Sequence, residues 1–310
     1  MNLSYETLVV LLLAMIDYRL VEALAAVLEC GGFERAADRL GITQSAVSQR
    51  IHSLEDGIGR ILVLRETPPR ATPAGERLLR HYRQVAALEE DTIAELGLRT
   101  QAEFRHVPIA VNADSLSVWL LDAIAPFLRQ SRITLEILVD DQDKTIRFLR
   151  SGAAVGCLTS QCIKVQGFTA MKIGALRYRL AATPAFVRRW FAAGFDRVSA
   201  ARAPIIHFNR DDRLQNRALT QAFGRPEVSP PAHYIPSAEK LAEAVFMGLG
   251  YAMIPDLQAA PEIKRGRLVE LDPRGRLETT LYWYRWNRPS GLVEEFSEII
   301  VNEGRRILSI

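Results

Sequence analysis

Hydrophobic and polar positions in the first third of the chain repeat with the period of an α-helix. An amphipathic helix is predicted over 18–28, followed by two shorter helices over 34–40 and 44–54. Gly41 and Thr43 separate the two short helices, and glycine commonly ends a helix whereas threonine commonly caps the next one. The pattern therefore predicts a helix pair joined by a tight turn.

The second helix of this pair has a polar face without Lys or Glu. A helix that enters the major groove needs short polar side chains near base edges and amides that can pair with adenine. Arg50 lies nearer the apolar edge, where pairing with an acid is an alternative role. The candidate DNA-binding residues of this segment are Thr43, Gln44, Ser45, Ser48, Gln49, Arg50 and His52.

A β-prone run over 61–65 and a proline-rich turn over 67–73 follow the helix pair. Arg65 ends the run and Arg70 lies in the turn, where guanidinium groups can lie along DNA phosphates. Residues 33–83 hold nine Arg and six acids, so this region is modestly basic. Together these features predict a winged helix-turn-helix, and an ordinary helix pair in an all-helical domain is the alternative.

A long helix is predicted over 74–98, between the predicted DNA-binding module and the rest of the chain. Its apolar positions fit a seven-residue repeat that is broken at Glu89. Such a stripe needs a partner, which is either a second subunit or the helix's own domain. The residues of the repeat are Leu79, Tyr82, Ala86, Ile93 and Leu96.

From Phe104 onward, predicted strands alternate with predicted helices. This alternation is typical of an α/β fold in which helices cross over a largely parallel sheet. The predicted strands are 107–111, 133–139, 155–158, 176–182, 205–208 and 251–254. The predicted helices are 115–129, 144–150, 184–193, 214–223, 237–247 and 292–308.

Three loops of this region are candidates for a small-molecule site, because ligands of open α/β sheets gather beyond the carboxyl ends of the strands. Helix N-termini and hydroxyls suit a carboxylate, while Asp114 could neutralise an ammonium. Helix capping is the alternative role for Asp114, Ser115 and Ser237. The candidate effector-binding residues are Asn112, Asp114, Ser115, Thr159, Ser160 and Ser237.

Composition narrows the class of protein. The 310 residues are 48% hydrophobic and 24% charged, which fits two or three folded domains and excludes a disordered chain. The net charge of +3 is compatible with nucleic-acid binding without requiring it. Three scattered cysteines form no disulfide framework, so we expect a cytoplasmic protein with buried thiols at Cys157 and Cys162 and no metal site. The apolar run 8–16 is too short to span a bilayer and lacks a cationic start, so no export is expected.

An enzymatic function is disfavoured. Ser237 and Lys240 have the spacing of a Ser-x-x-Lys nucleophile, but Ser237 opens an amphipathic helix, where a serine cap is expected. The sequence contains no Gly-x-Ser-x-Gly, no phosphate-binding Gly-x-x-x-x-Gly-Lys and no metal-binding His pair. We therefore expect a protein that is not an enzyme and has no bound cofactor.

The ordered pattern over 36–51, with Leu54-Glu55 and the wing ending in Thr72-Pro73-Ala74-Gly75, resembles the LysR-type transcriptional regulators. The string Ser-Ala-Val-Ser-Gln-Arg over 45–50 and the Pro-Pro-Arg of the wing are most similar to the arginine/lysine-responsive branch, also described as chromosome-replication initiation inhibitors. Two positions depart from the family pattern. Glycine precedes the first helix of the motif where serine is frequent, and Leu64 replaces an aromatic residue before Arg65.

The resemblance implies a winged helix-turn-helix, a long linker helix that pairs two subunits, and an effector domain of two subdomains like a periplasmic binding protein. The implied ranges are 15–73 for the DNA-binding domain, 74–99 for the linker, 103–175 with 280–310 for subdomain I, and 176–279 for subdomain II. The family pattern begins at Met15, so residues 1–14 are interpreted as an upstream extension or as the product of a misassigned start. Mass spectrometry of the native protein tests this, and an intact terminus at Met1 would contradict it.

The resemblance also implies a co-inducer in the cleft between subdomains, with lysine or arginine suggested by the branch. Asp140, Asp141, Asp211 and Asp212 are candidate acids for its cationic side chain. The main hypothesis is a dimeric or tetrameric regulator that binds double-stranded operator DNA, with RNA polymerase as a further candidate partner. The alternatives are a solute-binding protein whose N-terminal helices serve oligomerisation, or an enzyme on a two-lobed α/β fold.

Overall fold

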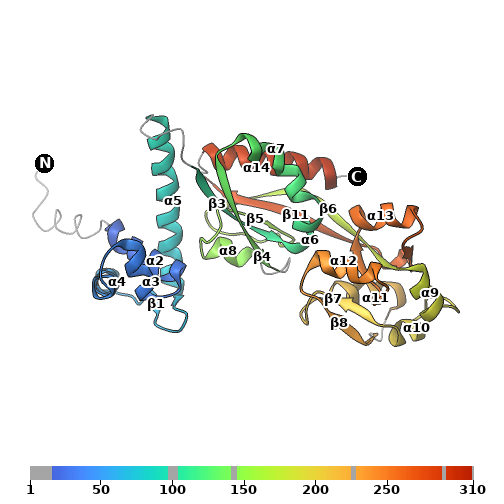
Figure 1. Ribbon diagram of the computed structural model, residues 1–310. Helices are drawn as coiled ribbons and strands as arrows, with labels where there is room; N and C mark the ends of the chain where they lie inside the picture. Colours follow the sequence, from blue (N-terminus) through green and yellow to red (C-terminus); the bar gives the residue numbers. More distant parts are fainter. Residues whose placement is uncertain (1–15, 97–103, 141–144, 225–227, 288–290, 309–310) are drawn as a thin grey trace, which may run out of the picture. The chain divides into compact units, whose positions relative to one another are not determined.

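The computed structural model describes residues 16–96, 104–140, 145–224, 228–287 and 291–308. The chain divides into two compact units, one formed by 1–103 with 147–154 and the other by 104–146 with 155–310 (Figure 1). The proposed extension over 1–14 lies outside the described residues. Within the described residues, no helix has the length and apolar character that a membrane span requires.

The N-terminal unit is a small helical bundle with a two-stranded wing, as predicted. Its elements are α2 (Tyr18–Cys30), α3 (Phe33–Leu40), α4 (Gln44–Ile58), β1 (Val63–Leu64), β2 (Arg70–Ala71) and α5 (Pro73–Glu95). Gly41 adopts a φ of 63° and ends α3, and the Thr43 side chain accepts a hydrogen bond from the Ala46 amide at the start of α4. Val21, Leu24 and Ile51 are fully buried where the three helices meet. The turn chemistry inferred from the sequence is therefore confirmed.

The wing closes against the start of α5 through the Thr72 to Gly75 segment. The Thr72 hydroxyl donates to the Ile61 carbonyl at 2.8 Å and accepts from the Gly75 amide at 3.2 Å. A Cβ atom at Gly75 would lie 2.1 Å from the Leu62 carbonyl oxygen, so only glycine fits at this approach of helix to strand. The described part of α5 ends before Leu98, so the last residues of the predicted 74–98 helix lie outside the described residues.

A seven-stranded sheet organises the C-terminal unit in the order β10-β6-β11-β5-β3-β4, with β9 also pairing with β6. Its strands are β3 (Arg105–Asn112), β4 (Ile133–Asp140), β5 (Gly156–Thr159), β6 (Phe168–Ala182), β9 (Ala252–Pro255), β10 (Val269–Glu270) and β11 (Leu277–Trp286). Strand β3 is parallel to β4 and β5, whereas β6 is antiparallel to β9, β10 and β11. The expectation of a largely parallel sheet is therefore wrong. The chain leaves on β6 and returns on β11, and this reversal makes the two long strands antiparallel.

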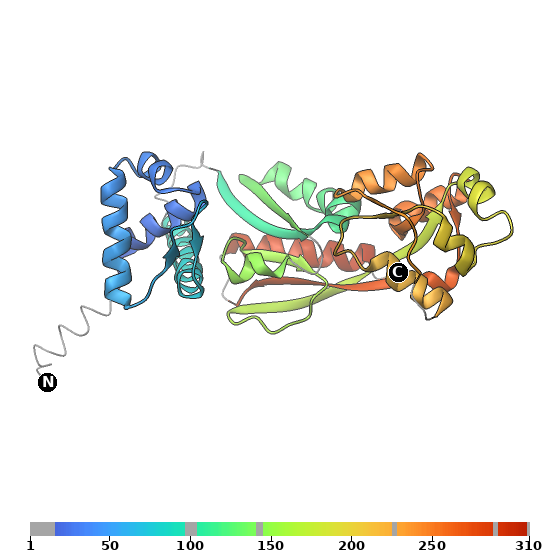
Figure 2. The same cartoon turned by 90° about the horizontal axis from the view of Figure 1, so that it is seen from below.

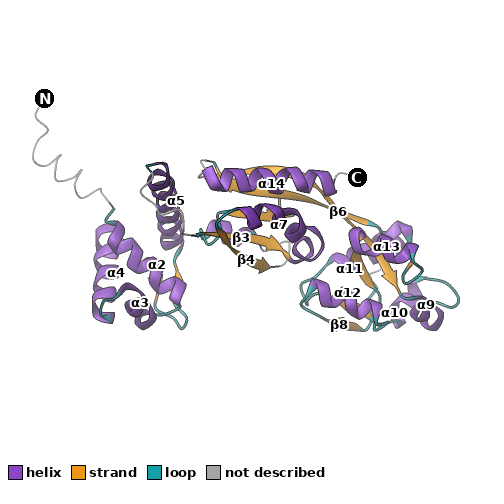
Figure 3. Ribbon diagram, turned by 45° about the horizontal axis from the view of Figure 1, so that its top comes forward, coloured by secondary structure: helices purple, strands orange, loops and turns teal. Residues whose placement is uncertain are grey.

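Two lobes share the long strands β6 and β11 (Figures 1 and 3). The first lobe contains β3 to β5 with α6 (Ala113–Ser115), a π-helical segment (Leu116–Leu120), α7 (Leu121–Gln130) and α14 (Gly291–Leu308). Helix α8 (Ile146–Arg150) falls mostly within the 147–154 segment that belongs to the N-terminal unit. The second lobe contains α9 (Pro184–Trp190), α10 (Arg197–Arg202), β7 (Ile205–His207), α11 (Leu214–Phe223), β8 (Ala232–Tyr234), α12 (Ala238–Phe246), α13 (Asp256–Lys264) and a 3-10 turn (Pro273–Gly275). Figure 2 shows β6 and β11 running side by side between the lobes. A ligand that contacts both lobes would thus act on the geometry of these strands.

Candidate functional site

The polar face of α4 is exposed, as a DNA-reading face must be. Gln44, Ser45, Gln49 and His52 are exposed, and Ser48 and Arg50 are half-buried. The opposite face buries Val47, Ile51 and Leu54 in the helical core. The Thr43 hydroxyl lies 2.9 Å from that of Ser45 and caps the helix. Arg50 forms no ion pair with any described residue, so the alternative role proposed for it is not observed.

An open hollow joins the first turn of α4 to the wing. It is lined by Phe33, Gln44, Ser45, Ser48, Arg65, Glu66 and Thr67. The Arg65 guanidinium lies 5.6 Å from the centre of the Phe33 ring, which holds this cation beside the start of the helix. Four of the predicted DNA-binding residues, Gln44, Ser45, Ser48 and Arg65, therefore line one concave surface. Phe33 was not predicted, although it is the first residue of α3, the first helix of the motif.

The remaining predicted contacts lie outside this hollow. The Arg70 side chain is 73% exposed and lies 3.8 Å from Glu66, so it is accessible on the wing. His52 lies 3.8 Å from Asp56 one turn further along α4. Exposed pairs of this kind are weak and can exchange for a phosphate.

Glu29 connects three helices of the N-terminal unit. Its carboxylate accepts hydrogen bonds from Arg39 of α3 at 2.7 Å and from Arg83 of α5 at 2.9 Å. Burial raises the pKa of Glu29, but the hydrogen bonds from Arg83 and Arg39 outweigh burial and leave the pKa below its usual value. The ionised carboxylate thus links the base of the long helix to the helix-turn-helix.

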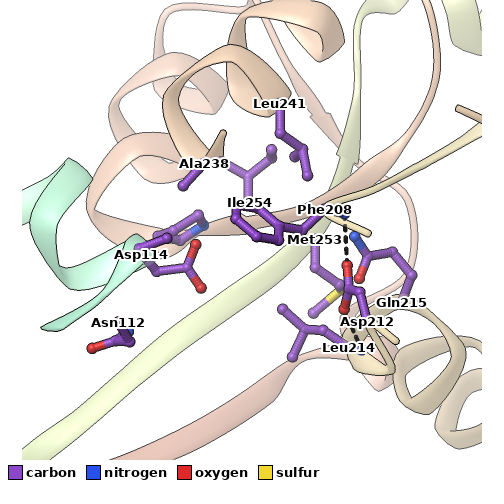
Figure 4. Close-up of a pocket in the computed structure, with 12 residues that line it drawn as sticks. Asn112, Asp114, Phe208, Asp212, Leu214, Gln215, Ala238, Leu241, Met253 and Ile254 are labelled. Atoms are coloured by element: carbon purple, nitrogen blue, oxygen red, sulfur yellow. Dashed lines mark hydrogen bonds between the residues drawn. The ribbon is translucent and has the colours of Figure 1, made fainter. Parts of the chain in front are cut away.

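The C-terminal unit contains a cavity of about 50 Å³ between the two lobes. Its polar lining residues are Asn112 and Asp114 from the first lobe and Asp212 and Gln215 from the second. Figure 4 shows the two pairs on opposite sides, with apolar side chains such as Met253 between them. The lining includes two carboxylates but no Lys, Arg or His. The cavity therefore favours a cationic ligand over an anionic one.

On the side of the first lobe, the end of β3 presents a buried amide and an acid. Asn112 is fully buried, and neither its side-chain oxygen nor its nitrogen has a hydrogen-bond partner among the described residues. The Tyr178 hydroxyl of β6 donates to the Asp114 carboxylate at 2.6 Å, which orients that carboxylate. Buried polar groups normally have partners, so the unpaired Asn112 amide indicates a place for a ligand.

On the side of the second lobe, Asp212 is held by the backbone. Its carboxylate accepts the amides of Phe208 and Leu214, each at 2.9 Å. His207 Nδ1 lies 3.9 Å from the same carboxylate. Burial lowers the pKa of His207, and the nearby Asp212 charge opposes this shift only in part. Asp212 is thus fixed in position beside a largely buried imidazole.

The other predicted effector residues do not line this cavity. Ser115 is buried without a hydrogen-bond partner among the described residues, and the Thr159 hydroxyl accepts the Gln161 amide at 3.3 Å. Ser160 follows Thr159 directly, and Ser237 caps α12 by accepting the Lys240 amide at 3.3 Å. Among the four candidate acids, Asp212 lines the cavity, Asp140 and Asp211 do not, and Asp141 lies outside the described residues.

Sequence reasoning missed Phe208, Gln215 and Met253, which line the same cavity. None of them belongs to a motif, and only the packing of the second lobe against the end of β3 brings them to the site. The described residues contain no group of three or more His, Cys, Asp or Glu side chains that could hold a metal ion.

Comparison with known proteins assigns both units to one family. Residues 18–76 match the model of the bacterial regulatory helix-turn-helix protein, lysR family, and residues 100–305 match the LysR substrate binding domain. The chain is 41% identical over 294 residues to the HTH-type transcriptional regulator ArgP of Aeromonas salmonicida, covering 94% of this chain and 98% of the relative. It is 39% identical over 278 residues to the regulator LysG of Mycobacterium bovis, covering 90% of each chain.

Solved structures give the same result. The crystal structure of ArgP from Mycobacterium tuberculosis matches with a TM-score of 0.84 and 38% identity, covering 94% of this chain and 98% of that one. Full-length LysG from Corynebacterium glutamicum with bound effector arginine matches with a TM-score of 0.77 and 32% identity, covering 94% and 99%. The resemblance inferred from the motifs, including the ArgP and LysG branch, is confirmed. The chain therefore belongs to the LysR family of bacterial helix-turn-helix transcriptional regulators.

Proposed function

We propose that a basic amino acid, lysine or arginine, controls this DNA-binding regulator by binding in the cavity between the two lobes. The observation that carries the proposal is the lining, which offers Asp114 and Asp212 on opposite sides and contains no basic residue. Two separated carboxylates match the two cationic groups of a basic amino acid. LysG of Corynebacterium glutamicum, which has a solved structure with bound effector arginine, supports this choice by similarity.

The polar groups suggest how the ligand lies. Asp114 and the Asn112 amide would bind the α-ammonium group, and Asp212 would bind the cationic end of the side chain. Ala238, the first residue of α12, lines the cavity, so the positive end of this helix is available to the ligand carboxylate. Met253 and Phe208 would contact the aliphatic stem.

Binding of this kind would be coupled to the geometry of the lobes. The cavity is small, about 50 Å³, so we propose that a change in the spacing of the lobes admits a whole amino acid. The lobes share β6 and β11, and Tyr178 of β6 donates directly to Asp114. A ligand that prefers one lobe geometry would shift the population toward it, which is the physical basis of effector control.

For the N-terminal unit we propose that Gln44, Ser45, Ser48 and Gln49 read base edges, with Arg65 and Arg70 on phosphates. Thr43, Arg50 and His52 would contact the flanking backbone of double-stranded DNA. The exposed end of α5 would join two subunits, as a dimer or within a tetramer. RNA polymerase is a further proposed partner, and we propose a cytoplasmic regulator without enzymatic activity.

Titration calorimetry of the full chain with lysine and with arginine tests the effector assignment. We expect Asp212→Asn to weaken binding of the bound amino acid by at least about tenfold, because a charge-assisted interaction is lost. Asp211→Asn is the matched control, since Asp211 is the adjacent acid and does not line the cavity. Gel shifts on the DNA upstream of the gene should respond to the same amino acid. Binding of neither amino acid would reject the effector assignment and leave DNA binding intact.

A further inference from the structure

We infer that Gln215 makes the cavity selective for a guanidinium group over an alkylammonium group, so that arginine is the preferred effector. The inference rests on the proposed function and deepens it. Neither the motifs of the sequence nor the family match assigns a role to this residue.

The orientation of the Gln215 side chain is fixed. The residue is 1% exposed, and its Nε2 donates to the Ile206 carbonyl at 2.8 Å. A carbonyl oxygen can only accept, so the amide nitrogen has to face Ile206 and the amide oxygen has to point away from it. The Gln215 Oε1 atom has no hydrogen-bond partner among the described residues, and the residue lines the cavity. If the Gln215 amide were flipped, its Oε1 atom would lie against the Ile206 carbonyl oxygen, and both atoms are acceptors.

Gln215 is the second residue of α11 and Asp212 lies three residues earlier, just before that helix, so both present acceptors to the same end of the cavity (Figure 4). Each Asp212 oxygen accepts one backbone amide and keeps further acceptor capacity. A carboxylate and a fixed amide oxygen together present three acceptor atoms on two separate side chains. A buried acceptor that is left unfilled disfavours binding.

A guanidinium group fits this end of the cavity better for two reasons. It carries five donors, which suffice for the carboxylate and the amide oxygen together. These donors lie in one rigid plane, so a single group can bind both acceptors without losing further side-chain freedom. The three donors of an ammonium group diverge from a single nitrogen, so this compact group is less well placed to reach acceptors on two separate side chains. The wild-type chain should therefore bind arginine at least about tenfold more tightly than lysine or ornithine.

The test is calorimetry of the full chain with arginine, lysine and ornithine. Gln215→Met keeps the length of the side chain and removes the acceptor. We expect it to weaken arginine binding by at least about tenfold and to change lysine binding by less than about threefold, so that the preference disappears. Gln221→Met is the matched control on the same helix, because the Gln221 amide donates to the Arg274 and Arg276 carbonyls outside the cavity. It should retain the full preference for arginine.

Three outcomes overturn the inference. The first is that the wild-type chain binds lysine or ornithine as tightly as arginine. This outcome can be measured without any variant. The second is a folded Gln215→Met variant that keeps the preference, and the third is an equal loss of affinity for arginine and lysine, which indicates a structural role alone. Each of these leaves a basic amino acid as effector. If the wild-type chain binds none of the three, the proposed effector assignment itself fails.

Discussion

At the scale of single residues, Gln49 and Arg65 are expected to contribute differently to DNA binding. Gln49→Ala should reduce the preference for operator over unrelated DNA by about 1–3 kcal/mol, because an amide contact to one base edge is lost. Arg65→Ala should weaken binding to all sequences and lower the salt slope by about one, because one phosphate contact is lost. Fluorescence anisotropy on both kinds of DNA at several salt concentrations separates these effects.

Arg197→Ala is a suitable control for this experiment, since Arg197 is exposed on α10 of the C-terminal unit. It should leave both the affinity and the salt slope unchanged. A loss confined to the operator in Arg65→Ala would contradict the assignment of Arg65 to phosphate and make it a base reader.

His207 makes the stability of the second lobe depend on pH. Burial lowers its pKa in the folded chain below the value near 6.5 of an unfolded chain. As the pH falls through that value, the unfolded state takes up the proton first, so the free energy of unfolding decreases until the folded pKa is passed. Between pH 7.5 and 5.5, urea unfolding of the wild type should show this loss, and His207→Gln should reduce it. His233→Gln, at an exposed position on β8, should leave the pH dependence of unfolding unchanged. Equal pH dependence in all three proteins would refute the role of His207.

At the scale of elements, Ser237 illustrates a choice between capping a helix and binding a ligand. Its hydroxyl accepts the Lys240 amide at the start of α12, and its side chain does not line the cavity. Ser237→Ala should therefore lower the free energy of unfolding by about 1 kcal/mol and leave arginine affinity unchanged, and Ser237→Asn should restore stability. Thr183→Ala, which removes the corresponding cap of α9, should lower the free energy of unfolding by a similar amount. A large loss of arginine affinity in Ser237→Ala at unchanged stability would instead favour the effector contact.

The elements that the sequence predicted best are those whose signals are local. Helix α3 ends at Gly41 and α4 begins after Thr43 because a left-handed residue and a capping hydroxyl act within a few positions of the chain. The direction of β6 and β11 has no such signal. It depends on the second lobe being inserted between them, which only the tertiary structure shows.

The candidate site was predictable to the same limited degree. Asn112 ends the strand β3 and Asp114 lies in the short helix α6 that follows, and this junction of strand and helix is visible in the sequence. Asp212 could be named as an acid but could not be placed. Gln215 is an ordinary helical residue in the sequence, and its proposed importance arises from the Ile206 carbonyl, which fixes the orientation of its amide and leaves the amide oxygen without a partner among the described residues.

At the scale of the whole molecule, control of DNA binding requires that events in one unit reach the other or reach a second subunit. Helix α5 is the element that leaves the helix-turn-helix core. Its first turns bury Leu78 and Leu79 in that core, and Arg83 is tied to Glu29. Apolar residues further along are exposed, with Leu88 of α5 at 46% and Leu96, directly after the helix, at 66%. The two halves of the helix therefore have different surroundings, and the exposed second half is suited to another subunit.

This division predicts that the outer half of α5 holds the dimer together. Ile93 of α5 and Leu96, directly after the helix, are 42% and 66% exposed, and replacing both by Glu should place like charges across the proposed subunit interface and give a monomer. Analytical ultracentrifugation of the full chain measures the assembly. Operator affinity should fall when the dimer is lost, because a monomer cannot bind two half-sites at once. Val198→Glu is the control, since this residue is 61% exposed on α10. An unchanged dimer in the double variant would indicate that the subunit interface lies in the effector domain. Helix α5 would then only connect the two units of one chain.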